Sequence, residues 1–288
     1  MEFDEIKAVE LDKELTEAER DEWQAIYASY RSGSVMHASI AGVDLYRLSS
    51  ENEKKVMRCL IVIPYRVKII IPETQVYDKE RSTKYYVLHS MCGANIDFVI
   101  TRIDREAGFA IASRKLALSK IKQANHRRMP KEGDLIDVDV LAVSRNLCMV
   151  SYKGYDMTLA QRDITYTSVQ DLHEIIHPGE TRKAVVKGYY PEENVLRISI
   201  KEATPHPFDG IETRHPISST RIATINGKYA GGVFCMLYDG VTNVLCSYLS
   251  MQYDGDYHIG DSVEIVIQKY NYDRKLVYGK ILRKIRDK

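Results

Sequence analysis

The sequence lacks the long apolar run that would mark a membrane protein. The longest apolar run, around 59–63 and 67–72, is interrupted by Tyr65 and Arg66, and it falls far short of the ~18 residues that span a bilayer. The acidic start Met-Glu-Phe-Asp-Glu has neither the basic nor the apolar region of a signal peptide. We therefore expect a cytoplasmic protein that does not contact a membrane.

Excess charge and paired cysteines are also missing. The chain has 41 Lys and Arg against 40 Asp and Glu, a formal net charge of +1, which excludes a strongly basic nucleic-acid-binding tail. Its five cysteines are odd in number, and no two have the C-x-x-C spacing. This pattern favours neither a zinc ribbon nor a disulfide scaffold.

The sequence contains none of the common catalytic signatures. We find no H-E-x-x-H, no G-x-x-x-x-G-K-[ST], no G-x-G-x-x-G and no G-x-S-x-G. Asp137 and Asp139 have a D-x-D spacing, but the apolar residues around them indicate one polar face of a strand. We expect no enzymatic activity, no cofactor and no bound metal.

Tyrosine is the aromatic residue that the chain does have, with 20 Tyr against 5 Phe and 1 Trp. Tyrosine suits half-buried β surfaces, because its ring packs while its hydroxyl stays polar. After an N-terminal segment, Glu14–Tyr30, whose composition and spacing predict a helix, short alternating runs bounded by Gly, Pro, Asn or Asp predict strands. The sequence therefore predicts an all-β protein with an N-terminal helix.

An internal repeat organises the rest of the chain. Gly93–Lys115, Gly179–Lys201 and Gly260–Lys280 share one layout: a glycine, an alternating strand, a charged turn, a second strand, and a small residue near a lysine. Three further strands and a short helical connector precede each of these hairpins. Five strands in this order are those of an OB-fold, a partly open Greek-key barrel.

We expect three tandem five-stranded OB-fold barrels. The predicted division is an N-terminal helix (1–31), a first unit (32–116), a basic helical linker (117–130), a second unit (131–203), a Pro-rich linker (204–217) and a third unit (218–288).

At this level the residues resemble a known family. The closing strands at Ser113–Lys115 and Arg197–Ala203 are similar to that of the S-one RNA-binding domain. Gly232–Leu237, followed by the turn Asp239–Val241, resembles the family's second strand, and Ile259–Val263 resembles its entry to strand four. The resemblance covers roughly residues 31–285, and tandem copies are similar to ribosomal proteins of the S-one type.

The resemblance implies an RNA-binding face with aromatic residues on strands two and three and charged residues in the closing hairpin. In the third unit the strand-two aromatic is Phe234, and the strand-three position falls at Cys246. In the second unit Arg197 matches the basic position, while the strand-two aromatic falls at Cys148. The resemblance thus implies RNA binding by the second and third units.

The first unit matches this face least. Its strand-two and strand-three positions fall at Cys59 and Ile70, both apolar, although Asp104 matches the acidic position of the hairpin. The resemblance implies that this unit is degenerate as an RNA-binding surface. OB-folds without the aromatic pair often dock proteins, so a docking role is the alternative.

The residue chemistry itself supports stacking in the third unit. Along Val233–Tyr238, small apolar residues alternate with Phe234, Met236 and Tyr238. Phe234 and Tyr238 thus share one sheet face on which bases can stack. The alternative is that Phe234 covers a barrel edge or packs on a neighbouring unit.

The closing hairpins mix aromatic and basic side chains, as a nucleic-acid-binding loop does, although a solvated hairpin has the same composition. The hairpin candidates are Lys269, Tyr270, Tyr272, Arg274 and Lys275 in the third unit, and Tyr189, Arg197 and Lys201 in the second.

The segment Arg114–Arg128 is basic and contains no acidic residue. It can grip a phosphate backbone or be a solvated linker helix. Its candidate contacts are Arg114, Lys115, Arg127 and Arg128.

These observations predict a monomeric protein that binds single-stranded RNA, including messenger RNA, and acts in translation, with the small ribosomal subunit as a further partner. Two alternatives stay open. One is an OB-fold protein-interaction module, and the other is an accessory RNA-binding subunit of a nuclease or translation-factor assembly.

Overall fold

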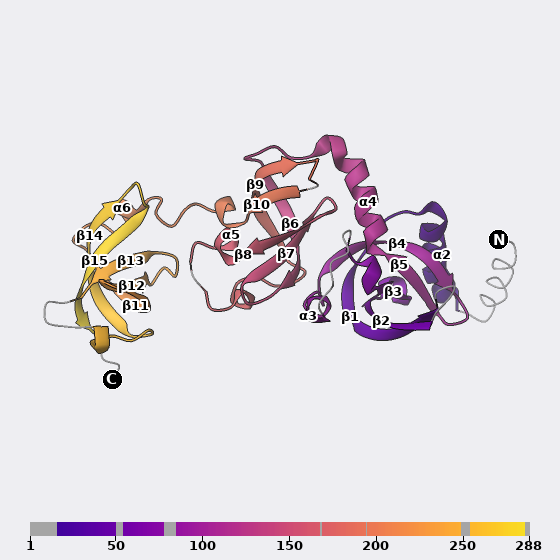
Figure 1. Cartoon of the computed structure of the whole chain (residues 1–288), viewed down its shortest axis with the longest axis horizontal. Helices are drawn as coiled ribbons and strands as arrows, with labels where there is room; N and C mark the ends of the chain where they lie inside the picture. Colours follow the sequence, from indigo (N-terminus) through magenta and orange to yellow (C-terminus); the bar gives the residue numbers. More distant parts are fainter. Residues whose placement is uncertain are drawn as a thin grey trace. The chain divides into compact units, whose positions relative to one another are not determined.

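The structure, a computed structural model, describes residues 16–49, 54–77, 85–167, 169–193, 195–248 and 254–285. It is mostly β, with closed or nearly closed five-stranded barrels consistent with the OB-fold (Figure 1). The expectation of an all-β chain is therefore confirmed in its main part. Two longer helices, α2 (Glu17–Ser32) and α4 (Arg114–Asn125), lie where a helix was predicted.

The first and third sheets are closed barrels with the same strand order. The first has the order β1-β2-β3-β5-β4 and the third β11-β12-β13-β15-β14. In each, the third strand pairs in parallel with the fifth and so closes the barrel. Their strands are β1 (Met36–Ser49), β2 (Lys54–Val62), β3 (Lys68–Pro72), β4 (Asn95–Asp104) and β5 (Phe109–Ser113), and β11 (Thr220–Tyr229), β12 (Gly232–Leu237), β13 (Asn243–Ser247), β14 (Ser262–Asn271) and β15 (Leu276–Lys284).

The middle sheet has the order β10-β9-β6-β7-β8, so β8 and β10 are its two edges. We call the space between these two edges the seam. The strands are β6 (Leu135–Val143), β7 (Leu147–Tyr152), β8 (Tyr155–Ala160), β9 (Thr181–Tyr190) and β10 (Val195–Ser199). The short helical elements are η1 (Pro64–Arg66), η2 (Glu73–Gln75), α3 (Tyr85–His89), η3 (His126–Arg128), α5 (Gln161–Ile164), η4 (Leu172–Glu174), η5 (Lys201–Ala203), α6 (Ile211–Arg214) and η6 (Asp254–Asp256).

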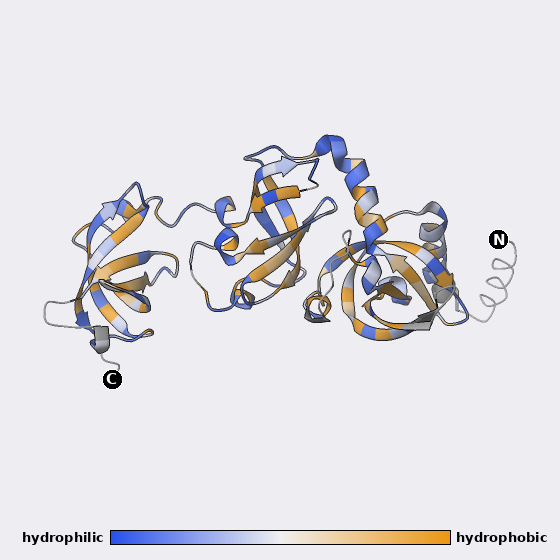
Figure 2. Ribbon diagram, viewed as in Figure 1, coloured by the Kyte–Doolittle hydropathy of each residue, from blue (hydrophilic) through white to orange (hydrophobic). Residues whose placement is uncertain are grey.

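The chain forms two compact units. One contains the first two sheets, up to Ile164 together with Val169–Ala203, and the other contains Thr165–Ser168 and the chain from Thr204 onward. In Figure 2, orange apolar and blue polar residues alternate along the strands of the sheets, as expected for barrels with an apolar interior. Among the described residues, no helix is long and apolar enough to span a membrane.

The repeated glycines make the same backbone contact in each sheet. The N–H groups of Gly93, Gly179 and Gly260 donate to strand-one carbonyls at 2.9, 2.9 and 2.8 Å. The accepting residues are Ile40, Val140 and Ile225, each of which donates its own N–H back to the residue after the glycine. All three glycines have positive φ (87°, 88° and 96°), a conformation that favours glycine.

A β-bulge follows each of these contacts. The pairing of strand one with strand two shifts register between Ile40 and Gly42, between Val140 and Ala142, and between Ile225 and Gly227. A bulge increases the local twist, which lets one long strand pair with two different neighbours. The repeat in the sequence therefore corresponds to a repeated barrel corner.

The strand register corrects the end of the third repeat. Ala112 and Ile198 pair with Ile100 and Val186 just before the hairpin bulge, and in the third sheet Gly279 pairs with Ile267 in the same way. Gly279 is thus equivalent to Ala112 and Ile198, not to the small residue that ends the first two repeats. Composition aligned Gly279 with Ser113 and Ser199, whereas the register places Lys280 at their position.

Helix α2 packs against the first barrel. Trp23 and Ile26, 8% and 0% exposed, belong to the same apolar cluster as the interior of this barrel. The guanidinium of Arg105 lies 4.1 Å from the centre of the Trp23 ring, and Arg66 pairs with Glu22 at 2.9 Å. The single tryptophan of the chain is therefore a packing residue.

Helix α4 begins with a buried ion pair. Arg114 is 1% exposed, and its two terminal nitrogens donate to the carboxylate of Asp156 on β8 at 2.6 and 2.8 Å. It also donates to the carbonyl of Val76 at 3.0 Å. Burial opposes the charge, but the attraction of Asp156 outweighs it and raises the pKa of Arg114. The pair joins the first barrel, α4 and the middle sheet within one compact unit.

The two repeat glycines of this unit meet, which predicts a difference between equivalent substitutions. A Cβ on Gly179 would lie 2.4 Å from the carbonyl oxygen of Gly93, whereas a Cβ on Gly93 would have 4.0 Å to its nearest atom. Gly93→Ala should lower the free energy of unfolding by ~1–2 kcal/mol, which is the cost of positive-φ strain alone. Gly179→Ala should lower the free energy of unfolding, measured in urea, clearly more than Gly93→Ala does. Equal decreases would show that the close contact is unimportant.

The Arg114–Asp156 pair predicts strong non-additivity. Asp156→Leu should destabilise the first compact unit by about 3–5 kcal/mol, because it leaves a buried guanidinium without its partner. Replacing both residues, by Arg114→Met with Asp156→Leu, should cost much less than the sum of the single changes. Thermal unfolding of the three variants measures this, and additive costs would contradict the account of the pair.

Candidate nucleic-acid interface

Five residues, one on each strand, form a row across the outside of the third barrel. Gly227 of β11 pairs with Phe234 of β12, which pairs with Leu245 of β13. Leu245 pairs with Tyr278 of β15, and Tyr278 pairs with Lys269 of β14. We call this set, and its equivalents in the other sheets, the outer row.

The alternation predicted for β12 is present. Val233, Cys235 and Leu237 are at most 2% exposed and belong to the barrel core. Phe234 points to the other side, is half-buried, and lies with its ring 5.2 Å from that of Tyr229 at an angle of 56°. One side of the ring is therefore supported by the protein itself.

A cavity of about 600 Å³ opens on this row. The Phe234 ring and Leu245 give it an apolar floor, while Lys228, Arg274 and Lys275 supply positive charge. The side chains of Asn226 and Asn243, joined by a 2.8 Å hydrogen bond, add amide groups. The remaining lining residues are Tyr166, His206, Pro207, Phe208, Gly227, Val241, Thr242, Leu276 and Val277.

The Pro-rich segment 204–217 packs on the third barrel. Phe208 and Ile211, 9% and 2% exposed, join its core cluster. The Tyr270 hydroxyl donates to the carbonyl of His215 at 2.6 Å, and the Tyr272 hydroxyl donates to Glu212. Both rings also pack edge-on against Phe208. Burial raises the pKa of Tyr270, and the bond to Glu212 raises that of Tyr272.

Tyr270 and Tyr272 therefore hold the chain segment beside the cavity. This differs from the sequence hypothesis, which gave both rings to RNA. The hairpin residues that do line the cavity are Arg274 and Lys275, in the turn between β14 and β15. Lys269 lies on the outer row with its ammonium group 5.1 Å from the Tyr278 ring centre. Tyr238 is 94% exposed at the end of β12, outside the cavity lining.

Asp239 anchors the turn after β12. Its carboxylate accepts hydrogen bonds from the backbone and hydroxyl of Thr242, and it contacts Arg214 and His215 at 3.1 and 3.0 Å. Burial alone would raise its pKa, but these hydrogen bonds outweigh burial and hold the pKa well below the ordinary 3.8. The turn and the segment before the barrel are thus tied to one carboxylate.

The outer row of the middle sheet is different, because part of it is covered. Ala142 and Met149 occupy the positions of Gly227 and Phe234. They are 7% and 8% exposed and belong to the apolar cluster of the first barrel. The row continues with Thr158, which pairs with Met149 and is exposed. The first barrel therefore covers the centre of the face that resemblance assigned to RNA.

In the first barrel the outer row is aliphatic. Ile61 and Ile70 are equivalent to Phe234 and Leu245, and Ile70 pairs with Ile111 of β5. Ile61, Ile70 and Cys59 form their own small cluster with Tyr46, Met57 and Phe109 packed against it. The register also corrects two equivalences, because the strand-two positions are Ile61 and Met149 and not Cys59 and Cys148. Cys246 likewise points into the third barrel core.

The candidates of the second unit and linker lie in different surroundings. Arg114 is a correction, because its buried pair with Asp156 takes it away from any RNA phosphate. Tyr189 is half-buried with its hydroxyl 3.0 Å from that of Tyr155. Arg197 lies over the Tyr190 ring at 5.0 Å. The other linker and hairpin candidates are Lys115 and Lys201, both partly exposed, and Arg127 and Arg128, both exposed in η3.

Sequence reasoning missed Lys228, Leu245 and Tyr278. Lys228 lines the cavity beside Phe234, and Tyr278 completes the outer row. The signal for Tyr278 was its place directly before Gly279 in the repeat. Using it requires the register of the parallel pair β13–β15, which alternation within one strand does not give.

Asp239 predicts a pH dependence in the third barrel. A carboxylate with a lowered pKa contributes stability at neutral pH that is lost as the pH falls below its ordinary value of 3.8. Asp239→Asn should therefore destabilise the protein at pH 7, and the difference from the unaltered chain should shrink towards pH 3. Asp273→Asn, in the exposed β14–β15 turn, is the matched control for thermal unfolding. A difference that does not change with pH would contradict this.

Comparison with known proteins gives partial matches of low identity. The small ribosomal subunit protein bS1 of Rhodopseudomonas palustris is 23% identical over 151 residues, covering 51% of this chain and 27% of that protein. The protein of the same name from Chlamydia trachomatis is 24% identical over 277 residues, covering 91% and 45%. These matches confirm the resemblance to the S-one family that the closing hairpins indicate.

A third relative carries an enzyme name. The 4-hydroxy-3-methylbut-2-enyl diphosphate reductase of Clostridium acetobutylicum is 24% identical over 138 residues, 47% of this chain and 22% of that protein. The chain spans less than half the length of each of these three relatives. No family model matches the chain. A solved multidomain protein with nucleic acid binding domains from Streptococcus pneumoniae covers 87% of the chain and 74% of its own at 8% identity, with a TM-score of 0.21 that supports no structural argument.

Proposed function

We propose that the chain binds single-stranded RNA through the outer row and cavity of the third barrel. The observation that carries the proposal is the half-buried Phe234 ring at the floor of a cavity edged by Lys228, Arg274 and Lys275. Single-strand binding needs an aromatic platform for bases and cations for phosphates, and here both lie around one cavity. The similarity to bS1 proteins supports the same reading.

The finer parts of the proposal rest on the resemblance and on the sequence. Each five-stranded sheet is one OB-fold domain of the S-one type, and the three stand in tandem. The protein acts on messenger RNA in translation at the small ribosomal subunit, in the cytoplasm, as a monomer and by binding rather than catalysis. The near-neutral charge of +1 gives this binding a modest electrostatic component.

A second candidate function, protein docking, belongs to the first barrel. Its outer row is aliphatic at Ile61, Ile70 and Ile111, where an RNA-binding row carries rings and cations, and Ile61 and Ile70 are themselves only 7% and 0% exposed. Leu45 and Val56, on the opposite face of the β1–β2 hairpin, are 63% and 54% exposed. Exposed apolar residues on this hairpin suit a protein partner, including one in a nuclease or translation-factor assembly.

The central prediction concerns Phe234. Phe234→Leu keeps an apolar side chain but removes the stacking platform, so single-stranded RNA affinity should fall by about 1–3 kcal/mol. Lys275→Ala should instead reduce the salt dependence, lowering the slope of log affinity against log salt by ~0.7, the value for one phosphate of a single strand. Fluorescence anisotropy with a labelled RNA over a series of salt concentrations measures both effects.

Ile222→Ala is the matched control, because Ile222 is an exposed apolar residue of β11 outside the cavity lining. It should leave RNA affinity unchanged. If Phe234→Leu lowers the melting temperature but not the affinity, Phe234 is a packing residue and the third barrel is not the RNA-binding part.

A further inference from the structure

The open seam of the middle sheet contains a second cavity, of about 490 Å³. In the closed barrels the corresponding strands pair directly, Ile70 with Ile111 and Leu245 with Tyr278. The residues at these positions in the middle sheet are Thr158 on β8 and Arg197 on β10, and both line the cavity. The seam thus lies between Thr158 and Arg197, the two ends of the outer row, whose central residues Ala142 and Met149 are covered.

Helix α4 forms part of the cavity wall. A Cβ on Gly154, in the turn between β7 and β8, would lie 2.6 Å from the carbonyl of Leu118, so this turn packs directly on the helix. Leu118 and Lys122 both line the cavity. Two groups that the sequence separates, the basic linker and the hairpin of the second unit, therefore meet at one site.

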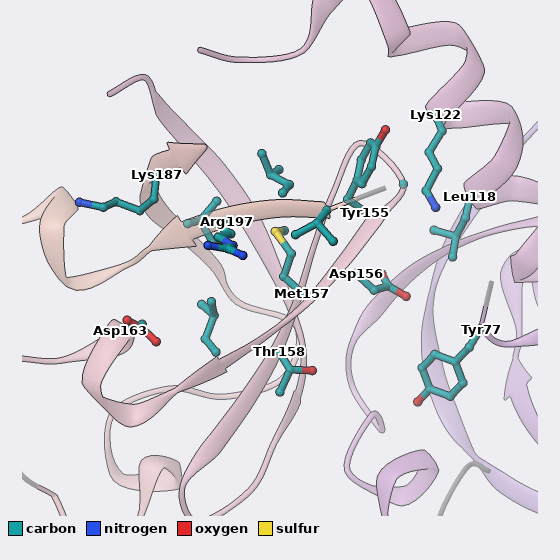
Figure 3. A pocket seen from close by; sticks show the side chains of 15 residues that line it. Tyr77, Leu118, Lys122, Tyr155, Asp156, Met157, Thr158, Asp163, Lys187 and Arg197 are labelled. Carbon is teal, nitrogen blue, oxygen red and sulfur yellow. The ribbon is translucent and has the colours of Figure 1, made fainter. Parts of the chain in front are cut away.

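Positive charge lies on both sides of an apolar floor. Figure 3 shows Lys122 at one side and Lys187 and Arg197 at the other, with Met157 between them. Met157 and Leu196 are 8% and 4% exposed, so they form the floor of the cavity. This arrangement matches a nucleotide within a strand, which has a phosphate on each side of its sugar and base.

The acidic residues of the cavity do not cancel this charge. Asp156 is held by both terminal nitrogens of Arg114, which is buried behind it. Asp163 has Arg162 at 3.8 Å. Lys187, by contrast, is paired with Glu202 at 2.7 Å, which offsets its charge, so the candidate phosphate contacts are Lys122 and Arg197. The guanidinium of Arg197 lies over the Tyr190 ring. In this arrangement the N–H groups point outward in the plane of the guanidinium, where they can donate to a phosphate.

The seam also offers polar groups that suit a ribose. Edge strands present backbone N–H and C=O groups on their unpaired side, and the exposed hydroxyl of Thr158 lies on β8. A ribose 2′-hydroxyl both donates and accepts, and proteins use it to distinguish RNA from DNA. A cavity of this volume is in the range that holds one nucleotide.

We propose that the seam between β8 and β10 binds the ribose-phosphate of one nucleotide of single-stranded RNA, with Lys122 and Arg197 on its phosphates and Thr158 on its ribose. This inference rests on the proposed function. It adds a second contact that is made by a helix and two strand edges and that favours RNA over DNA.

The test measures the binding of the intact protein to a labelled single-stranded RNA and to DNA of the same sequence. Lys122→Ala and Arg197→Ala should each lower RNA affinity several-fold and reduce the salt slope by ~0.7. Thr158→Val keeps the shape of the side chain but removes its hydroxyl, so it should weaken RNA binding and leave DNA binding unchanged.

The matched controls are Lys183→Ala, on the same strand as Lys187, and Arg145→Ala, exposed in the turn between β6 and β7. Both lie outside the cavity lining. If the seam variants behave as these controls while Phe234→Leu still weakens binding, the seam inference is wrong and the proposed function stands. If the unaltered protein does not bind RNA, the proposed function itself fails.

Discussion

The structure depends on one repeated backbone contact, the pairing of a strand-one residue with a positive-φ glycine. Ile40, Val140 and Ile225 each accept from the glycine and donate to the residue after it, and a bulge follows at once. Because this corner fixes the register of strand one against two neighbours, it also decides which side chains point outward. The outer rows, and therefore every candidate binding surface, follow from it.

The same corner leads to three different surfaces. In the third barrel the outer row carries Phe234 and Tyr278 beside a cationic cavity. In the middle sheet the equivalent residue, Met149, is covered by the first barrel. The exposed part of the outer row therefore lies at the seam. In the first barrel Ile61 and Ile70 make the row aliphatic. One architecture thus provides a stacking site, a charged seam and a buried aliphatic row.

Much of the fold could be predicted from the sequence, because local sequence patterns specify it. Alternation located the strands, and Gly93, Gly179 and Gly260 marked the repeat, since each glycine occupies a conformation that other residues avoid. The outward positions could not be predicted in the same way. The register after each bulge sets these positions, so Cys148 was taken for the place of Met149, one residue away, and Cys59 for that of Ile61, two residues away on the same face. Arg114 was misjudged because its partner lies on another sheet.

The account makes one central claim, that RNA contacts the outer row of the third barrel. Hydrogen–deuterium exchange of the intact chain, with and without single-stranded RNA, tests it most directly. We expect slower exchange in β12, in β13 and in the turn between β14 and β15, because the amides there lie around Phe234, Arg274 and Lys275. Slower exchange confined to β2 and β3 of the first barrel, with no change in the third, would contradict the claim.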